Sequence, residues 1–186
     1  AGDIIGCLAA PNEVDKVAWI RLFACSSHYS RIEIWKKLYE KVLIFFQHKV
    51  NEIAVLGIQP WLTNLLLEQN FKTNQHIIVF EWNRHFITSE ITVPDLLIQP
   101  LTSADIQQVS LVDKICFSPR WQLSEYSIDL ALKQSGYATI AIFEGKMIGY
   151  QICTESYSSA HLARLAIDPN FRGKNFAKAL LIDLVS

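Results

Sequence analysis

The sequence predicts an α/β protein, with a mixed, mostly antiparallel sheet that is flanked by helices and built as two related halves. Three observations lead to this prediction. Short apolar runs rich in β-branched and aromatic residues alternate with amphipathic segments of helical period. The series restarts after residues 84–94, which carry few structural signals. The 186 residues, 51% of them hydrophobic, are enough to bury a large core.

The first half, residues 1–83, has the periodicity of strands and amphipathic helices in alternation. Its predicted elements, in order, are strands at 4–10 and 17–25 forming a hairpin, a helix at 32–46, a strand at 52–57, a helix at 60–69 and a strand at 76–82. Ser26 or Ser30 is expected to cap the first helix, and Pro60 suits the start of the second.

The second half, residues 95–186, follows the predicted linker at 84–94. Its predicted elements are a strand at 96–100, helices at 102–116 and 124–135, strands at 137–143, 146–155 and 161–167, and a helix at 176–185. The two halves align as a diverged repeat. I-I-G-C at 4–7 matches M-I-G-Y at 147–150, and A-W-I-R-L-F-A at 18–24 matches H-L-A-R-L-A-I at 161–167.

Composition argues against several classes of function. With 17 basic and 18 acidic residues the net charge is -1, which disfavours a nucleic-acid partner. The apolar runs are too short to span a membrane, and no signal peptide is expected. The four cysteines form no C-x-x-C pair and the histidines show no ligand spacing, so no metal site is predicted. The cysteines are expected to be reduced, as in a cytoplasmic protein.

The chemistry is expected at residues 160–186, which predict a strand, a short loop and a helix. Such a turn can aim backbone N–H groups at a phosphate, and the helix dipole adds attraction. The loop R-G-K-N-F-A at 172–177 fits the pattern R-x-x-G-x-[G/A] except at Asn175, where the pattern has glycine. Because Asn is the next best residue at positive φ, we expect the turn to form.

This loop, with Pro169 before it, resembles the acetyl-CoA-binding motif of the GNAT superfamily of N-acetyltransferases. The order of predicted elements from residue 96 to residue 185 also matches that family. The resemblance implies a GNAT-like fold and acetyl-CoA as the co-substrate. The cofactor-binding residues that it implies are Leu165, Ala166, Ile167, Arg172, Gly173, Lys174, Asn175, Phe176 and Ala177.

The first half resembles the later part of the same fold. Residues 61–71 look like the family helix that ends in Y-E-K-x-G-F, with Leu67 in place of the tyrosine and Asn70 in place of glycine. The loop at 25–31 has no glycine, so this half is interpreted as degenerate and without cofactor. Three arrangements stay open: a piece of a longer tandem protein, two halves that complete one sheet, and a swap between two chains.

Transfer to an amine needs a group that removes a proton. His161 falls where some family members carry a glutamate base, and Glu155 is the second candidate. Tyr157 is a candidate proton donor to the leaving thiolate. Each of the three also has a purely structural interpretation, as a strand end, a hairpin end or a packing residue. Arg164, among apolar neighbours, is expected to be paired or to lie at the sheet rim, and binding of an acidic substrate group is the alternative.

The sequence therefore predicts an acetyl-CoA-dependent N-acetyltransferase that acts by direct transfer on a small-molecule or peptide amine. The alternative is a non-catalytic acyl-CoA-binding or structural module of a larger tandem assembly. A homodimer is compatible with either interpretation, because the high hydrophobic content of the chain allows an apolar interface.

Overall fold

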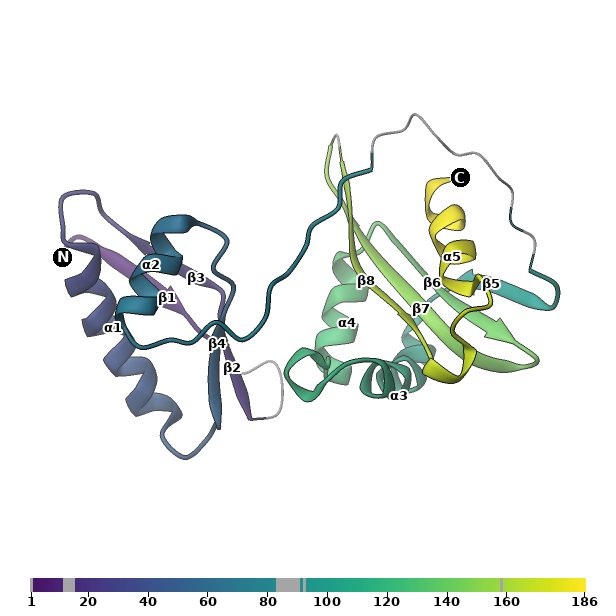
Figure 1. The fold of residues 1–186 in the computed structure, drawn as a ribbon, viewed down its shortest axis with the longest axis horizontal. Helices are drawn as coiled ribbons and strands as arrows, with labels where there is room; N and C mark the ends of the chain where they lie inside the picture. The colour runs from purple at the N-terminus through teal and green to yellow at the C-terminus, as the bar shows by residue number, and fades with distance from the viewer. Residues whose placement is uncertain (1, 12–15, 83–90, 92, 158) are drawn as a thin grey trace. The chain divides into compact units, whose positions relative to one another are not determined.

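The chain divides into two compact units, residues 1–82 and 83–186 (Figure 1). The computed structural model describes residues 2–11, 16–82, 91, 93–157 and 159–186. Most of the predicted linker at 84–94 lies outside these residues. Each unit has its own sheet strands, helices and apolar core, and each is described by itself below.

The N-terminal unit contains short strands and two helices. They are β1 (Gly6–Ala9), β2 (Val17–Ile20), β3 (Leu22–Cys25), α1 (Arg31–Phe46), β4 (Glu52–Val55) and α2 (Pro60–Glu68). β1 pairs with β3 antiparallel, whereas β2 pairs with β4 parallel. The prediction of one continuous strand at 17–25 is therefore wrong. The segment forms two strands that are separated at Arg21, whose N–H donates to the Ala9 carbonyl.

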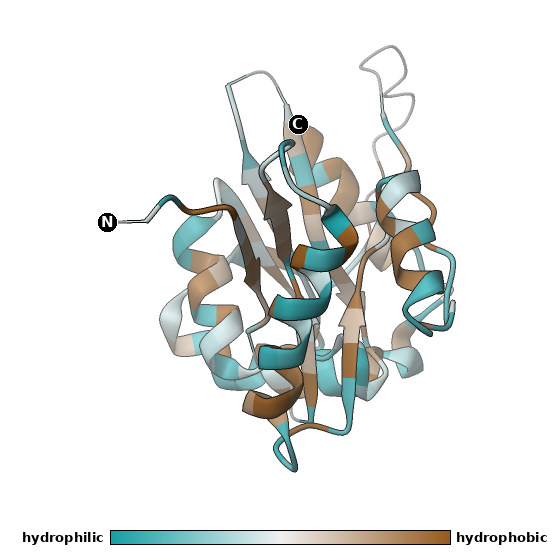
Figure 2. Cartoon of the chain, turned by 90° about the vertical axis from the view of Figure 1, so that its left-hand side faces the viewer, coloured by the Kyte–Doolittle hydropathy of each residue, from teal (hydrophilic) through white to brown (hydrophobic). Residues whose placement is uncertain are grey.

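Aromatic side chains fill the core of this unit. Trp35, fully buried on α1, stacks on Tyr39 at a centroid distance of 5.4 Å and meets the edge of Phe23 at 5.1 Å. The strands are largely apolar and the helices are banded, as the amphipathic pattern predicts (Figure 2). The strand predicted at 76–82 is wrong, because these residues pair with no strand in the part of the chain that the structure describes, and Val79 and Phe80 are 84% and 89% exposed.

The C-terminal unit is built on a sheet of four antiparallel strands in the order β5-β6-β7-β8. The strands are β5 (Leu96–Pro100), β6 (Tyr137–Phe143), β7 (Lys146–Glu155) and β8 (Ala160–Ile167). The helices are α3 (Ile106–Cys116), α4 (Glu125–Gln134) and α5 (Phe176–Val185), with 3-10 turns at Ser103–Asp105, Pro119–Trp121 and Pro169–Phe171.

Helices cover both faces of this sheet, which confirms the predicted fold class. One core cluster joins α3 and α4 to the sheet through residues such as Val109, Ile128 and Ile152. The second joins α5 to the other face through Phe176 and Leu180. Burying an apolar side chain of this size contributes about 1.5–3 kcal/mol, so α5 is firmly attached to the sheet. β8 leads directly into α5 and thus fixes the loop between them (Figure 1).

Candidate cofactor and catalytic site

The loop from β8 to α5 is anchored at its first residue, Asp168. The Asp168 N–H donates to the Ile148 carbonyl at 2.8 Å, and its carboxylate accepts from the Asn170 N–H at 2.9 Å and from Lys146 Nζ at 3.3 Å. The Asn170 N–H holds the pKa of Asp168 below its usual range, and Lys146 adds to this effect against the cost of burial. The loop therefore leaves the sheet from a fixed point.

Two residues of the loop have left-handed backbone conformations. Gly173 has φ +80° and Asn175 has φ +64°. The prediction that Asn175 would support a turn at positive φ is confirmed. A Cβ on Gly173 would contact nothing within 4 Å, so the backbone conformation, and not crowding, favours glycine there. The sequence pattern therefore specifies this turn despite its departure from glycine at Asn175.

The turn leaves the start of α5 without a side-chain cap. Asn175 is the N-cap residue, yet its side chain makes no capping hydrogen bond, and the first turn contains no acidic residue. The first N–H groups of a helix have no partner within the helix, and the helix dipole makes this end attractive to anions. In contrast, α4 is capped by Ser124, which accepts from the Ser127 N–H at 3.1 Å. The start of α5 is thus free to bind an anion.

A cavity of about 460 Å³ opens beside this helix start. Its volume is typical of a small-molecule site. All of the nine predicted cofactor residues except Lys174 line it. These eight are Leu165, Ala166, Ile167, Arg172, Gly173, Asn175, Phe176 and Ala177. The predicted cofactor residues did not include four further lining residues, which are Cys116, Phe117, Phe171 and Lys178. Cys116 and Phe117 come from the end of α3, more than 40 residues away.

Arg172 brings positive charge to the cavity. Its Nε donates to the Ile167 carbonyl at 3.2 Å, which joins the loop to the end of β8. Burial raises the pKa of the Cys116 thiol, and a hydrogen bond from Arg172 opposes this effect. Lys178, in the first turn of α5, is a second cation at the cavity. Diphosphate recognition requires such charges near free N–H groups.

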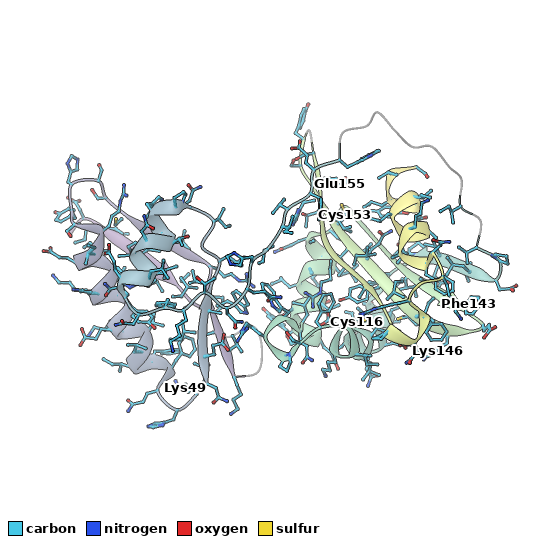
Figure 3. The ribbon with its side chains drawn as sticks, in the orientation of Figure 1. Lys49, Cys116, Phe143, Lys146, Cys153 and Glu155 are labelled. Atoms are coloured by element: carbon cyan, nitrogen blue, oxygen red, sulfur yellow. The ribbon has the colours of Figure 1, made fainter. Side chains whose placement is uncertain are left out.

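The predicted catalytic residues lie at the other end of the hairpin. His161 pairs with Thr154 and Glu155 with Ala160, and neighbouring positions in a strand point to opposite faces. Ile167 lies six positions after His161, about 20 Å along an extended strand. Tyr157 lies in the loop between the strands and is fully exposed. Figure 3 shows Glu155 and Lys146 at opposite ends of β7. None of the three lines the cavity, and their roles stay predictions.

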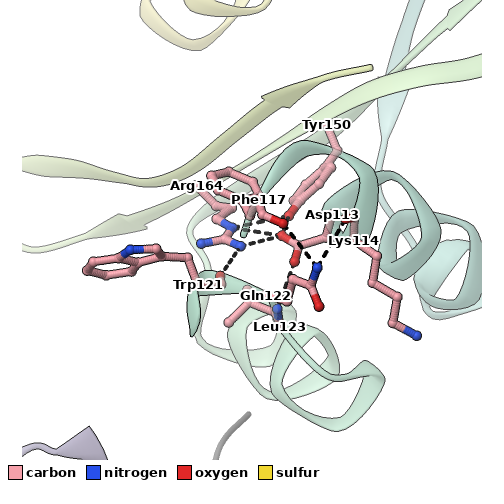
Figure 4. A network of polar contacts seen from close by, with 8 residues as sticks. All are labelled: Asp113, Lys114, Phe117, Trp121, Gln122, Leu123, Tyr150 and Arg164. Atoms are coloured by element: carbon pink, nitrogen blue, oxygen red, sulfur yellow. Dashed lines mark hydrogen bonds and ion pairs between the residues drawn. The ribbon is translucent and has the colours of Figure 1, made fainter. Parts of the chain in front are cut away.

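Arg164 is occupied by partners within the protein. Its Nη2 lies 2.5 Å from Asp113 Oδ2 and 2.5 Å from the Trp121 carbonyl, and its side chain is only 13% exposed (Figure 4). The expectation that it is paired is confirmed. A second carboxylate would compete with Asp113, so binding of an acidic substrate is not favoured here. The sequence contains a sign of this pairing, because Asp113 places a charge beside Val109 and Val112 on the apolar face of α3.

A strand that leads through a left-handed turn to an uncapped helix start is an arrangement that nucleotide- and coenzyme-binding proteins use to hold phosphate groups. Residues 106–186 match the model of the acetyltransferase (GNAT) family, so this part of the chain is a GNAT-family domain. The match begins at α3 and ends with α5, and it includes the loop described above.

Solved structures of acetyltransferases are similar to about half of the chain. One is the ribosomal-protein-S18-alanine N-acetyltransferase from Escherichia coli, at 20% identity and a TM-score of 0.45, covering 48% of this chain and 57% of that protein. Another is the PaiA N-acetyltransferase from Thermoplasma acidophilum with coenzyme A, at 17% identity and a TM-score of 0.44, covering 48% and 69%. A GNAT family acetyltransferase from Elizabethkingia anophelis with acetyl-CoA bound has 17% identity and a TM-score of 0.39, covering 50% and 57%.

The chain thus spans little more than half the length of the first of these structures. The search of curated proteins gives no significant match. Within the described residues, no three or more His, Cys, Asp or Glu side chains are grouped to hold a metal ion. None of the helices that the structure describes has the length and apolar character needed to cross a membrane.

Proposed function

We propose that the C-terminal unit binds acetyl-CoA and that the protein transfers the acetyl group to an amine. The observation that carries this proposal is the uncapped start of α5, which follows Gly173 and Asn175 at positive φ and borders the cavity. An uncapped helix end beside Arg172 and Lys178 fits a diphosphate. The family match over residues 106–186 supports an acyl group as the cargo.

The residues of this chain would supply binding, orientation and proton transfer. Acetyl-CoA supplies an activated acyl group, and the acceptor supplies a nitrogen that must be neutral to attack. A lysine amine has a solution pKa of about 10.4, so a base has to take its proton. His161 and Glu155 are our candidates for that base, and Tyr157 is our candidate for protonating the leaving thiolate. We infer direct transfer to a small-molecule or peptide amine.

The first test is a calorimetric titration of acetyl-CoA into the protein and into Gly173→Asp. The variant strains a positive-φ position and places a negative charge at the helix start. We expect micromolar binding by the original chain and at least a 100-fold loss in the variant. Gly145→Asp is the matched control, because Gly145 also has positive φ, +76°, and open space around it, but lies in the β6–β7 turn. No binding by the original chain would contradict the proposal.

A non-catalytic acyl-CoA-binding module is the second candidate. It is favoured by the position of the proposed bases, which lie on opposite faces of the β7–β8 hairpin, at its end far from the cavity. The double variant His161→Ala/Glu155→Gln separates the two candidates in an amine-acetylation assay that detects the released thiol. An enzyme would lose turnover and keep its affinity for acetyl-CoA, whereas a binding module would have no turnover to lose.

We further propose a cytoplasmic location, since all four cysteines are free thiols and such thiols persist in reducing compartments. No nucleic acid or membrane is needed as a partner for this function. A homodimer and a larger tandem assembly remain proposals for the state in which the unit works, and light scattering on the purified chain tests the first of them.

A further inference from the structure

The segment between α3 and α4 contributes one wall of the cavity and has little regular structure of its own. Residues 117–124 contain only the 3-10 turn Pro119–Trp121. Phe117 and the preceding Cys116 line the cavity. Short-range support comes from Gln122, whose Nε2 donates to the carbonyls of Phe117 at 3.0 Å and Lys114 at 3.1 Å. The wall therefore depends on bonds from outside the segment for its position.

Those bonds come from a buried polar network around Asp113 (Figure 4). Asp113 is fully buried and accepts from the Tyr150 hydroxyl at 2.5 Å and from Arg164 Nε at 2.9 Å, both through Oδ2. Its other oxygen, Oδ1, accepts from the backbone N–H of Leu123 at 2.7 Å. One carboxylate thus joins β7 and the edge strand β8 to the end of the wall segment.

Arg164 holds the same segment at two further points. Its Nη2 donates to the Trp121 carbonyl at 2.5 Å. Its guanidinium carbon lies 3.5 Å from the centroid of the Phe117 ring, within the range of a cation–π contact. A lysine could reproduce the charge but not this planar contact with its fork of donors. Arg164 therefore contacts both the backbone of the segment and the ring that faces the cavity.

Stability alone does not explain such a network. Replacing a buried ion pair with apolar residues of similar volume is often neutral or stabilising, because desolvation offsets the attraction between the charges. What an apolar replacement cannot supply is a set of directional bonds to two particular backbone groups, the Leu123 N–H and the Trp121 carbonyl. The network is suited to fixing the position of the segment.

We propose that Arg164 is a positioning residue that, together with Asp113 and Tyr150, fixes Phe117 and Cys116 as the wall of the acyl-CoA cavity. Arg164 acts through Phe117 and does not itself line the cavity. The inference that this wall sets acyl-CoA affinity rests on the proposed function. The inference that the network sets the position of the wall does not, so the two can be tested separately.

The test compares the original chain with the triple variant Asp113→Leu/Tyr150→Phe/Arg164→Met. This variant removes all three polar groups and leaves no unpaired charge buried. The position of the wall is measured as the rate at which iodoacetamide alkylates Cys116, followed by peptide mass spectrometry. Affinity for acetyl-CoA is measured by calorimetry on the same samples. The matched control is Asp129→Leu/Lys133→Met, which removes the surface ion pair of α4.

We expect the triple variant to unfold at a temperature close to that of the original chain, while Cys116 is alkylated about tenfold faster and acetyl-CoA binds about tenfold more weakly. The control should match the original chain in both measurements. Arg164→Lys and Phe117→Leu should each give an intermediate effect, and they decide the question if the triple variant does not fold. Rates and affinities within twofold of the original chain in all these variants would overturn the proposal.

The measurements also separate this proposal from the proposed function. If the original chain does not bind acetyl-CoA, the proposed function fails, and the alkylation rates alone decide whether the network positions the wall. If acetyl-CoA binds and protects Cys116 in the original chain and less so in the triple variant, both proposals are supported. Faster alkylation of Cys116 with unchanged affinity would overturn the link between the wall and acyl-CoA binding.

Discussion

The starts of α1 and α5 follow strands that align in the sequence repeat, but only one of them is open. At α1, Ser30 accepts a hydrogen bond from the Glu33 N–H at 3.4 Å, and Glu33 places a negative charge in the first turn. At α5, Asn175 forms no cap and no acidic side chain is present in the first turn. The first N–H groups of the helix in a βα unit can thus be bonded by side chains of the same unit or left free for a ligand.

The nearby basic residues differ in the same way. Arg31, at the start of α1, lies over the Trp61 ring at 5.0 Å and is used within its unit. Arg172, ahead of α5, lines the cavity. The degenerate character of the N-terminal unit stays a prediction, and what the structure shows is that a capping serine and an acidic residue occupy the start of α1 but not that of α5. The following predictions test it.

The largest effect is expected from removing charge at the open helix start. The double variant Arg172→Gln/Lys174→Gln should weaken acetyl-CoA binding by about 2 kcal/mol, or roughly 30-fold, because hydrogen bonds to charged groups are the stronger ones. The loss should shrink at high salt, where charges are screened. Calorimetry at two ionic strengths measures both. The pair Arg31→Gln/Lys36→Gln at α1 is the control, and an equal loss there would contradict the comparison.

A β-branched residue at the left-handed turn should be costly. Asn175→Val should destabilise the C-terminal unit by about 1–2 kcal/mol, since the left-handed region is unfavourable for side chains branched at Cβ. Asn175→Gly should stabilise the same unit, by a smaller amount. Urea denaturation followed by a probe in each unit measures the change. Asn70, which also has φ +64°, is the matched position in the other unit, and Asn70→Val should leave acetyl-CoA affinity unchanged.

Removing the cap of α1 should affect stability and not binding. Ser30→Ala should destabilise the N-terminal unit by about 1 kcal/mol, the typical value for loss of an N-cap. Acetyl-CoA affinity should not change, because this helix start is not a binding site in our account. Thermal unfolding and calorimetry on the same sample are sufficient. Ser124→Ala at α4 is the control, because it gives the loss of stability expected for a capped helix of the C-terminal unit. A change in acetyl-CoA affinity for Ser30→Ala would argue against our comparison.

The smallest effect concerns pH. The folded pKa of Asp168 is lowered, chiefly by the Asn170 N–H, so its ionised form stabilises the loop. This contribution is present above the unfolded pKa of about 3.9 and is lost as the pH falls through the lower folded value. Asp168→Asn should therefore flatten the decline in stability below about pH 4. Denaturation at pH values about one unit apart, from about pH 2 to about pH 6, measures the free energy of unfolding of both proteins. Parallel curves of this free energy against pH would contradict the assignment.

Local signals in the sequence predicted most of the C-terminal unit. The strands at 96–100, 137–143 and 146–155 and the helix at 176–185 have the predicted bounds. The apolar periodicity of each element lies within the element itself, so no distant contact is needed to recognise it. The phosphate-type loop was equally recognisable, because its geometry depends on Gly173 and Asn175, two residues with characteristic backbone preferences.

Contacts between distant residues could not be predicted in this way. The segment 76–82 is rich in strand-forming residues, but strand formation requires a partner, and the structure shows none for it. Arg21 interrupts a run that looks continuous in the sequence. The pairing of Arg164 with Asp113 spans 51 residues, so the sequence indicated that Arg164 needed a partner but not which residue provides it. The wall formed by Cys116 and Phe117 was missed for the same reason.

The most direct test of our central claim is an NMR titration of the isotope-labelled protein with coenzyme A, followed at the backbone amides of the two helix starts. Our account predicts that the amide signals of Gly173, Phe176 and Ala177 shift with a common affinity, while those of Ser30 and Glu33 stay unchanged. Shifts at Ser30 and Glu33 in place of those at α5, or no shift at either helix start, would contradict it.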